Sequence, residues 1–296
     1  MRILPLLLFL SVLPVFSMGQ IIDNRLGNAF REEMYFNREF LWQNKVCSVT
    51  CTHAVKRPNR PIDQKPDLQV FHFNEVGLLT QIDKVTSVLS LVDSLTVEFK
   101  RNDLGQVELR SEKSQKGFFS TKYVYEGTNV VRADYETAEN ISGEANKLIP
   151  GKTTSINSET FQYSDVGDFG LRKASYNNYQ LLYSNEIITK NNLGYITSRT
   201  EELTMSGKTR TSEYVYNDKG WVSRITYSDN AGGAVRTDDF VYDTVGNLLK
   251  VEYRQSGELM REIEVLYTDT MFIEAILDHD LASHDIEIIK FIYDFY

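Results

Sequence analysis

The chain repeats one short phrase at a nearly fixed interval, and this repeat constrains the fold more than any other feature. Residues 240–253 read FVYDTVGNLLKVEY, and the same pattern stands 26 residues earlier as YVYNDKGWVSRITY. A glycine or a substitute marks each copy, at Gly77, Gly105, Asn129, Gly167, Gly194, Gly220, Gly246 and Met271. Successive markers lie 28, 24, 38, 27, 26, 26 and 25 residues apart. Periods of this length indicate a repeat architecture, so we expect about eight copies of one structural unit.

Turn chemistry predicts the form of that unit. In YDTVG, Asp243 stands at the first position of a type I turn, where its carboxylate accepts backbone N–H groups two residues on. Gly246 then takes the left-handed conformation of a G1 bulge, which Asn129 also tolerates. Alternating strands flank the turn, with Phe240 and Tyr242 on the same face. The sequence therefore predicts an all-β, antiparallel meander of about eight hairpin units, shaped as a curved sheet or a partial barrel or shell.

Aromatic residues recur in step with the markers. The chain has 17 Tyr and 16 Phe but only 2 Trp. Four residues before most markers stands an aromatic side chain, at Phe73, Tyr125, Tyr163, Tyr216, Tyr242 and Tyr267. Stacked units would align these rings as an interior ladder, and each aromatic pair contributes about 0.5–1.5 kcal/mol beyond area burial. The alternative interpretation, a sugar-stacking platform, makes ligand-binding candidates of Tyr214, Tyr216, Trp221 and Tyr242.

At YVYNDKGWV and FVYDTVGNLL the sequence resembles the YD repeats of the RHS family, which are bacterial secreted or surface proteins built on a YDxxGxL core. The matching residues are Tyr242, Asp243, Gly246 and Leu248, and, with Asn for Asp and Val for Leu, Tyr216, Asn217, Gly220 and Val222. The resemblance covers roughly residues 68–296. It implies a long β-sheet that coils into a shell, secretion, and carbohydrate or cell-surface binding. The chain has far fewer repeats than a closed shell of that family and lacks its processing region and toxin, so toxin delivery is not expected.

The N-terminus is typical of export. Residues 1–19, MRILPLLLFLSVLPVFSMG, pair an early Arg with a short apolar run and small residues at the end, which predicts a signal peptide cut before Gln20. The run falls short of the roughly 18 apolar residues of a membrane span, and no later stretch is apolar enough for one. We therefore expect a periplasmic, cell-surface or extracellular protein with no transmembrane segment.

The segment at 20–66 differs from the repeat domain at 67–296. Phe30, Met34 and Leu41 stand at roughly helical spacing, which predicts a short helical or irregular cap on one edge of the sheet. A Pro-containing stretch then leads into the repeats. Within the repeats, the long interval at 137–159 predicts a polar insertion, and such loops often carry the binding function of repeat proteins.

The only two cysteines are Cys47 and Cys51, in a stretch that alternates like a strand. A straight strand would hold their Cα atoms ~13 Å apart, whereas a disulfide needs less than about 7 Å. Either the stretch bends and the cysteines are bridged, or both thiols stay free. Because export permits oxidation, we expect the bend and the bridge.

One polar cluster, LDHDLASHDIE, supplies metal-site candidates in His279, Asp280 and His284. It also falls where the repeat period requires a hairpin connection, and polar residues in such turns are usually only solvated. No common motif of a hydrolase, P-loop or dinucleotide site is present. We therefore expect no cofactor, no metal and no catalysis.

The formal net charge is −9, and an acidic surface argues against a nucleic-acid partner. These features together predict an exported, non-catalytic β-repeat protein that binds or builds at the cell envelope or outside the cell, with a glycan or a cell-surface protein as partner. Two alternatives stay open, a carrier of an apolar ligand such as lipid on a curved sheet and a metal-assisted hydrolase acting through His279 and His284. The sequence leaves open the ligand, the closure of the sheet and the oligomeric state.

Overall fold

The computed structural model describes residues 20–296 except 32, 34, 89–90 and 143–146. The predicted signal peptide at 1–19 and Met34 of the predicted helix lie outside the described residues. Within the described part of the chain, no helix has the length and hydropathy of a membrane span. The elements in chain order are α1 (Arg38–Gln43), β1 (Val46–Lys56), β2 (Ile62–Phe73), β3 (Leu79–Val88), β4 (Leu91–Arg101), β5 (Val107–Ser114), β6 (Gly117–Glu126), β7 (Asn129–Ala138), β8 (Thr154–Val166), β9 (Gly170–Tyr176), β10 (Leu182–Lys190), β11 (Ile196–Leu203), β12 (Lys208–Tyr216), β13 (Val222–Asp229), β14 (Arg236–Tyr242), β15 (Leu248–Gln255), β16 (Glu258–Tyr267), β17 (Ile273–Asp280) and β18 (Ile286–Phe295).

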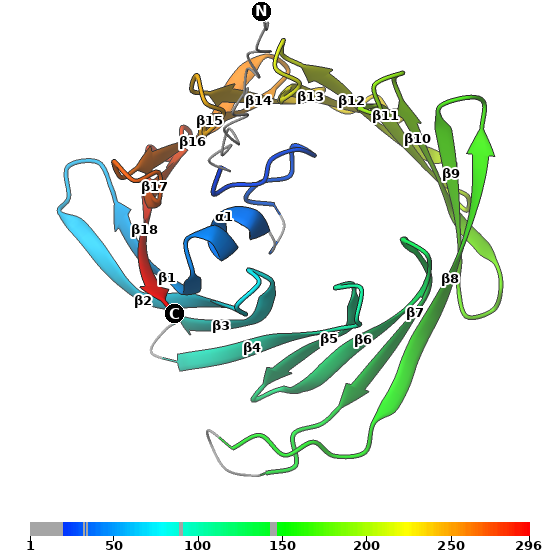
Figure 1. Cartoon of the computed structure of the whole chain (residues 1–296), viewed down its shortest axis with the longest axis horizontal. Coiled ribbons are helices and arrows are strands. Elements are labelled where there is room, and N and C mark those ends of the chain that lie inside the picture. Colours follow the sequence, from blue (N-terminus) through cyan, green and yellow to red (C-terminus); the bar gives the residue numbers. More distant parts are fainter. Residues whose placement is uncertain (1–19, 32, 34, 89–90, 143–146) are drawn as a thin grey trace, which may run out of the picture.

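The eighteen strands of the described chain form one closed antiparallel barrel (Figure 1). Each strand pairs with the next along the chain, and β1 pairs with both β2 and β18. The all-β antiparallel meander is thus confirmed, and the sheet, expected as a curved sheet or a partial barrel or shell, closes completely into a barrel. Residues 46–56, which the sequence analysis assigned to the N-terminal cap, form the closing strand. Closure removes the free edges along which open sheets pair with other chains.

The repeat markers fall at one end of the barrel. In the described residues, the eight markers lie at or beside every second connection, beginning with β2–β3 and β4–β5 and ending with β16–β17. In an antiparallel meander, every second connection lies at the same end of the sheet. Gly220 and Gly246 have φ values of +80° and +101°. Their N–H groups donate to the carbonyl oxygens of Asn217 at 3.0 Å and Asp243 at 3.4 Å. These two bends are equivalent, as the period predicts.

Two markers were assigned incorrectly within their turns. Between β6 and β7 the left-handed residue is Gly127, with φ +60°, while Asn129 already pairs with Glu126 at the ends of the strands. The hairpin is tighter here and needs no bulge at Asn129. Gly167, with φ +62°, belongs to a different reversal, in which Val166 pairs with Gly170.

The tyrosine column tethers neighbouring hairpins through hydroxyl groups. Each of these tyrosines donates from its hydroxyl to a backbone carbonyl of the preceding unit, in the pairs Tyr125–Val107, Tyr163–Val130, Tyr216–Ile196, Tyr242–Val222, Tyr267–Leu248 and Tyr293–Ile273, at 2.8–3.0 Å. Three ring contacts, Tyr195–Tyr216, Trp221–Tyr242 and Phe272–Tyr293, join a tyrosine to the residue after the preceding marker, with centroids 4.8–5.4 Å apart. The predicted ladder of equivalent rings is thus replaced by phenol-to-carbonyl links between units.

The N-terminal segment lies inside the barrel (Figure 1). We call the described residues from 20 to 45, including α1, the plug. In the plug, Ile21, Ile22 and Leu41 are at most 1% exposed. They belong to one apolar cluster with inward-facing side chains of the strands at both ends of the chain, among them Val49, Phe71, Ile82, Val97, Ile225, Val251, Ile263, Ile276 and Phe291. The predicted cap on a sheet edge is therefore wrong, because a closed barrel has no edge and this apolar inner wall gains most from cover.

The turn at Asp243 gives a direct test of the repeat code. Its Oδ1 accepts from the backbone N–H groups of Val245 and Asn247, each at 2.9 Å, and of Gly246 at 2.6 Å. Asn217 makes the corresponding contacts in the preceding unit. Asp243→Ala is expected to lower the free energy of unfolding by about 1–2 kcal/mol, while Asp243→Asn changes it by about 0.5 kcal/mol or less. Urea denaturation of the two variants measures the difference, and equal losses would contradict the turn assignment.

The same turn has a defined pH dependence. Burial alone would raise the pKa of Asp243, but the hydrogen bonds from the Asn247 side chain and from the turn N–H groups hold it below its ordinary value. A lowered pKa in the folded state means that the stabilisation is present above the unfolded pKa, about 3.9, and is lost as the pH falls through the folded value. The Asp243→Asn variant should lack this acid-sensitive component.

Candidate functional site

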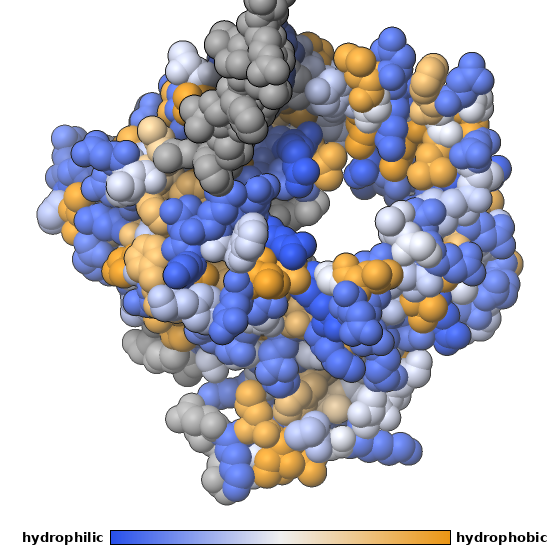
Figure 2. All heavy atoms as spheres, in the orientation of Figure 1, coloured by the Kyte–Doolittle hydropathy of each residue, from blue (hydrophilic) through white to orange (hydrophobic). Residues whose placement is uncertain are grey.

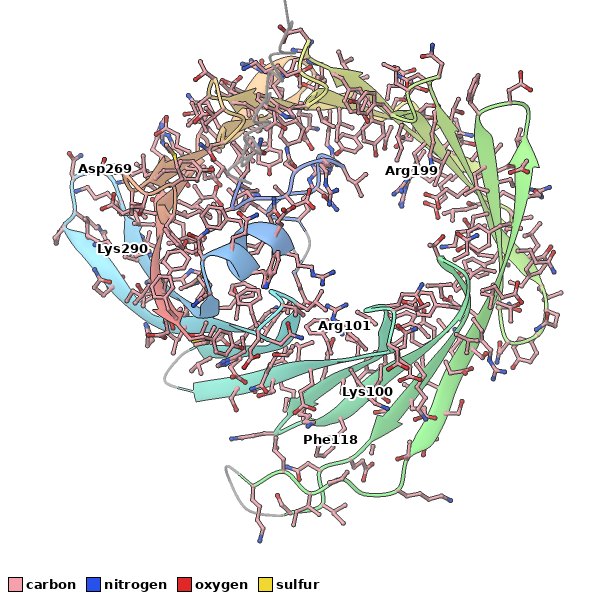
Figure 3. The ribbon with its side chains drawn as sticks, in the orientation of Figure 1. Lys100, Arg101, Phe118, Arg199, Asp269 and Lys290 are labelled. Atoms are coloured by element: carbon pink, nitrogen blue, oxygen red, sulfur yellow. The ribbon has the colours of Figure 1, made fainter. Side chains whose placement is uncertain are left out.

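The plug fills only one side of the barrel interior, which we call the lumen. Figure 2 shows an opening beside the plug, and the structure has a cavity of about 820 Å³ there. Residues from β7 to β14 line this cavity, and Arg199 on β11 points into it (Figure 3). The volume lies within the range of about 300–1,000 Å³ that is usual for small-molecule sites.

Strand register builds a charged row across the cavity wall. Lys173 pairs with Glu186, Glu186 with Glu201, Glu201 with Arg210 and Arg210 with Asp229, so five inward-facing positions stand side by side. Five basic and four acidic residues line the cavity, although the whole chain has 32 Lys and Arg against 41 Asp and Glu. The cavity wall is therefore polar, and its charge balance is the reverse of that of the chain.

Glu159 on β8 is held by two phenols. Tyr135 donates to Oε2 at 2.7 Å and Tyr183 donates to Oε1 at 2.9 Å. Burial, followed by the bond to Glu159, raises the pKa of Tyr183 to about 12 and raises the pKa of Tyr135 as well. Both phenols therefore remain protonated donors at neutral pH. They fix the carboxylate at the cavity wall, where its remaining lone pairs can accept from a ligand.

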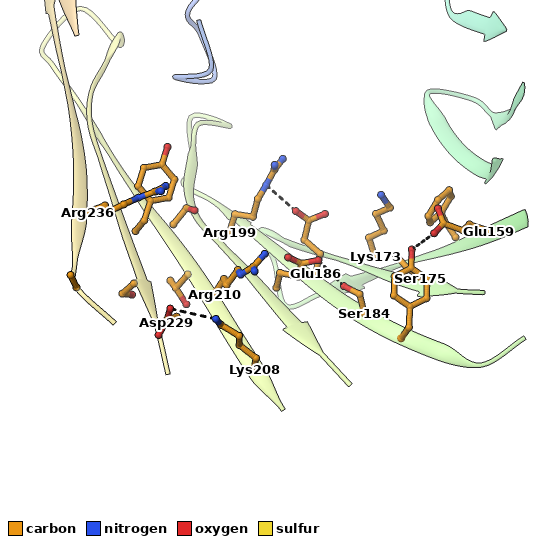
Figure 4. A pocket seen from close by; sticks show the side chains of 18 of the residues that line it. Glu159, Lys173, Ser175, Ser184, Glu186, Arg199, Lys208, Arg210, Asp229 and Arg236 are labelled. Atoms are coloured by element: carbon orange, nitrogen blue, oxygen red, sulfur yellow. Dashed lines mark hydrogen bonds and ion pairs between the residues drawn. The ribbon is translucent and has the colours of Figure 1, made fainter. Parts of the chain in front are cut away.

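Aromatic faces and further ion pairs complete the wall (Figure 4). Lys173 Nζ lies 4.4 Å from the centroid of the Phe161 ring. Arg236 lies over the Tyr227 ring at 5.2 Å. Arg199 pairs with Glu186 at 3.0 Å, which fixes both side chains. The cavity thus offers hydrogen-bond acceptors, cationic donors and ring faces, a combination that suits a polar ligand bearing hydroxyl groups.

Charged tethers hold the plug against the opposite walls. Arg31 pairs with Asp238 of β14, whose side chain is 3% exposed. Glu33 pairs with Arg110 of β5 at 3.0 Å and with Lys84 of β3 at 3.1 Å. Burial would raise the pKa of Glu33, but these two cations hold it below its ordinary value. The plug is thus anchored on two sides, and it separates the apolar part of the lumen from the polar cavity.

The outer wall of the barrel carries ion pairs as well as exposed apolar side chains such as Val215, Val241 and Ile292. Asp238 and Phe240 face the plug, so Asp239 between them faces outward, where it pairs with Arg224 of β13. Further outward ion pairs are Lys250–Glu262 at 3.1 Å, Lys122–Glu136 at 2.9 Å and Arg132–Asp134 at 2.9 Å. Charged side chains cost about 2–4 kcal/mol each at the centre of a lipid-facing barrel wall. The ion-paired positions of the outer wall are therefore suited to water.

The predicted aromatic candidates lie beside the plug rather than in the polar cavity. Tyr242 accepts a hydrogen bond from Asn24 of the plug at 2.8 Å in addition to its carbonyl link. Tyr214 and Tyr216 pack against the apolar cluster, and Trp221 lines a smaller cavity of about 350 Å³ formed with plug residues. Glu159, Lys173, Arg210 and the other cavity residues could not be recognised from the sequence, because polar residues occur on both faces of their strands.

The predicted metal-site residues lie in β17 and in the turn after it, whereas strands β7 to β14 line the cavity. Asp280 accepts from the backbone N–H groups of Ala282 at 2.8 Å and Ser283 at 3.0 Å, so it caps the β17–β18 turn. His279 is the second-last residue of β17, and His284 takes a φ of +59° in the turn. Among the described residues, no group of three or more His, Cys, Asp or Glu side chains is arranged to hold a metal.

The cysteines are not bridged. Cys47 and Cys51 lie in the same continuous strand, β1, and both are free. The bend that a disulfide requires is absent, so the expected bridge does not form. Cys51 faces the plug and is 2% exposed, and burial raises its pKa to about 12. Its thiol is therefore unreactive, and the side chain serves only in core packing.

No protein-family model matches the chain, and no curated protein matches it. Among solved structures, a porin-like protein from Bacteroides uniformis is 8% identical over 85% of this chain and 97% of that chain, with a TM-score of 0.39. A LolA superfamily protein from Nitrosomonas europaea is 9% identical over 84% of each chain, with a TM-score of 0.23. With TM-scores below 0.5, these similarities carry no inference about function, and the resemblance to YD repeats stays a prediction.

Proposed function

We propose that this chain is an exported, non-catalytic binding protein that holds a glycan in the free part of the barrel lumen. The observation that carries the proposal is the polar cavity of about 820 Å³, in which Glu159 is fixed by two phenols beside the ring of Phe161. Saccharides present hydroxyl groups to such carboxylates and C–H faces to aromatic rings. The ion pairs on the outer wall support a location in an aqueous compartment of the cell envelope or outside the cell.

A carrier of an apolar ligand receives less support from the geometry. Such a carrier needs an uncovered apolar concave face. In the described structure, Ile21, Ile22 and Leu41 of the plug already occupy the apolar part of the lumen. Charged residues line the part that stays free. An apolar ligand there would leave these groups without water or partners, which is costly.

A glycan-array screen of residues 20–296, followed by calorimetry with the best ligand, tests the proposal. Glu159→Gln should weaken binding at least about 10-fold, because hydrogen bonds to a charged acceptor are the strong ones. Glu136→Gln is the matched control, since Glu136 faces outward and pairs with Lys122. A screen without any glycan ligand, or equal effects of the two substitutions, would overturn the proposal.

A further inference from the structure

Three cations of the cavity have no acidic partner in direct contact. Among the described residues, Lys173, Arg210 and Arg236 form no ion pair with a carboxylate. By contrast, Arg224 on the outer face of the barrel wall forms an ion pair with Asp239. Lys173 and Arg236 instead lie against aromatic rings. These three cations of the cavity wall thus lack a direct carboxylate contact, and only the longer-range charge of Asp229 and Asp238 acts on Arg210 and Arg236.

The two arginines come from the same wall, on strands that are separated only by β13. Arg210 on β12 and Arg236 on β14 flank β13, and both line the cavity (Figure 4). The acids nearest to them are engaged. Asp229 accepts backbone N–H groups of Gly233 and Ala231 and pairs with Lys208 at 3.8 Å, and Asp238 pairs with Arg31 of the plug. The guanidinium groups are left to receive an acceptor from the cavity.

The cavity is also polarised along the barrel wall. On β8 to β11 the cavity has three acids, Glu159, Glu186 and Glu201, against the two bases Lys173 and Arg199, whereas on β12 to β14 it has three bases, Lys208, Arg210 and Arg236, against the one acid Asp229. A ligand that is neutral throughout would leave the arginine wall unsatisfied. A ligand with hydroxyl groups at one end and an anion at the other would match both walls, because guanidinium groups bind carboxylates through paired hydrogen bonds.

We propose that the ligand of the lumen is an acidic saccharide whose carboxylate binds between Arg210 and Arg236. This inference rests on the proposed glycan-binding function and adds the ligand's charge. The hydroxyl groups of the same saccharide bind at the Glu159 wall. The bases on β12 and β14 also attract an anionic ligand and so raise its rate of association, and this attraction weakens as salt is added.

Calorimetry with two trisaccharides tests this assignment: galacturonyl-galactobiose, whose one carboxylate is on a terminal sugar, and neutral galactotriose. We expect the acidic trisaccharide to bind at least about 10-fold more tightly, and its affinity to fall as NaCl is raised from 50 to 300 mM, because salt screens the attraction between the carboxylate and the arginines. The double substitution Arg210→Gln, Arg236→Gln should remove that preference. The control Arg132→Gln, Arg224→Gln, which removes two outward arginines, should retain it.

The outcomes separate the two proposals. Equal affinity for both trisaccharides would overturn the acidic-ligand inference and leave glycan binding intact, whereas binding of neither, together with an empty glycan array, would overturn both. Arg236→Lys keeps the charge and is expected to retain the preference for the acidic trisaccharide. If the double variant fails to fold by circular dichroism, the single Arg210→Gln variant replaces it, and an unchanged preference in that variant contradicts the assignment.

Discussion

Gly77→Ala is expected to lower the free energy of unfolding by about 2–5 kcal/mol. Gly77 has a φ of +74°, and left-handed geometry costs a residue with a Cβ about 1–2 kcal/mol. The added Cβ would also lie 2.3 Å from the carbonyl oxygen of Arg38 and 3.0 Å from the backbone nitrogen of Trp42. Both belong to the backbone of α1, so the contact is relieved only by moving the helix, and such overpacking costs about 1–3 kcal/mol. The β2–β3 turn therefore also packs against α1 of the plug.

Gly194→Ala is the matched control for that experiment. Gly194 occupies the equivalent turn with a φ of +85°, but no heavy atom lies within 4 Å of the position that an added Cβ would take. Only the backbone strain applies, and the expected loss is about 1–2 kcal/mol. Urea denaturation followed by circular dichroism and by Trp fluorescence measures both variants. Equal losses at the two turns would show that α1 does not rest on the β2–β3 turn.

The turns were predictable from the sequence because their signal is local. Asp243 and Gly246 stand three residues apart, and the Gly246 N–H donates to the Asp243 carboxylate within the turn itself. Closure of the barrel has no such signal. The side chains of Ser48 and Asp294 are bonded across 246 residues, and the ladder around them uses backbone groups that nearly every residue has. The period therefore gave the hairpins but not the partner of the last strand.

The candidate site was hidden because both faces of its strands are polar. Along β10, Ser184 and Glu186 face the cavity while Asn185 faces outward, so alternation of apolar and polar residues cannot assign the faces. One signal was available in TDDFVY, where Asp238 shares a column with Phe240. An acid within an otherwise apolar column indicates a buried partner, although the sequence does not say that the partner is Arg31.

The Arg31–Asp238 pair that locks the plug supports the other large prediction. Arg31→Met should lower the free energy of unfolding by about 3–5 kcal/mol, because it leaves a buried carboxylate without its cation. Arg31 also lies over the rings of Tyr227 at 4.9 Å and Tyr253 at 5.6 Å, and these contacts are lost as well. Arg25→Met is the control, since the Arg25 side chain is 85% exposed and surface pairs contribute about 1 kcal/mol or less.

Two measurements distinguish the loss of the ion pair from the loss of packing in Arg31→Met. They are the pH dependence of its stability and the effect of adding Asp238→Asn. Burial raises the pKa of Asp238, although Arg31 and the Tyr227 hydroxyl partly offset this, and removing Arg31 raises it further. A raised folded-state pKa means that the carboxyl is tolerated when protonated and costs stability as the pH rises through that value. The deficit of Arg31→Met should therefore be largest at neutral pH and shrink toward pH ~4. Arg31→Met combined with Asp238→Asn should recover part of the loss at pH 7, and a loss that is additive and independent of pH would mean that Arg31 acts only by packing.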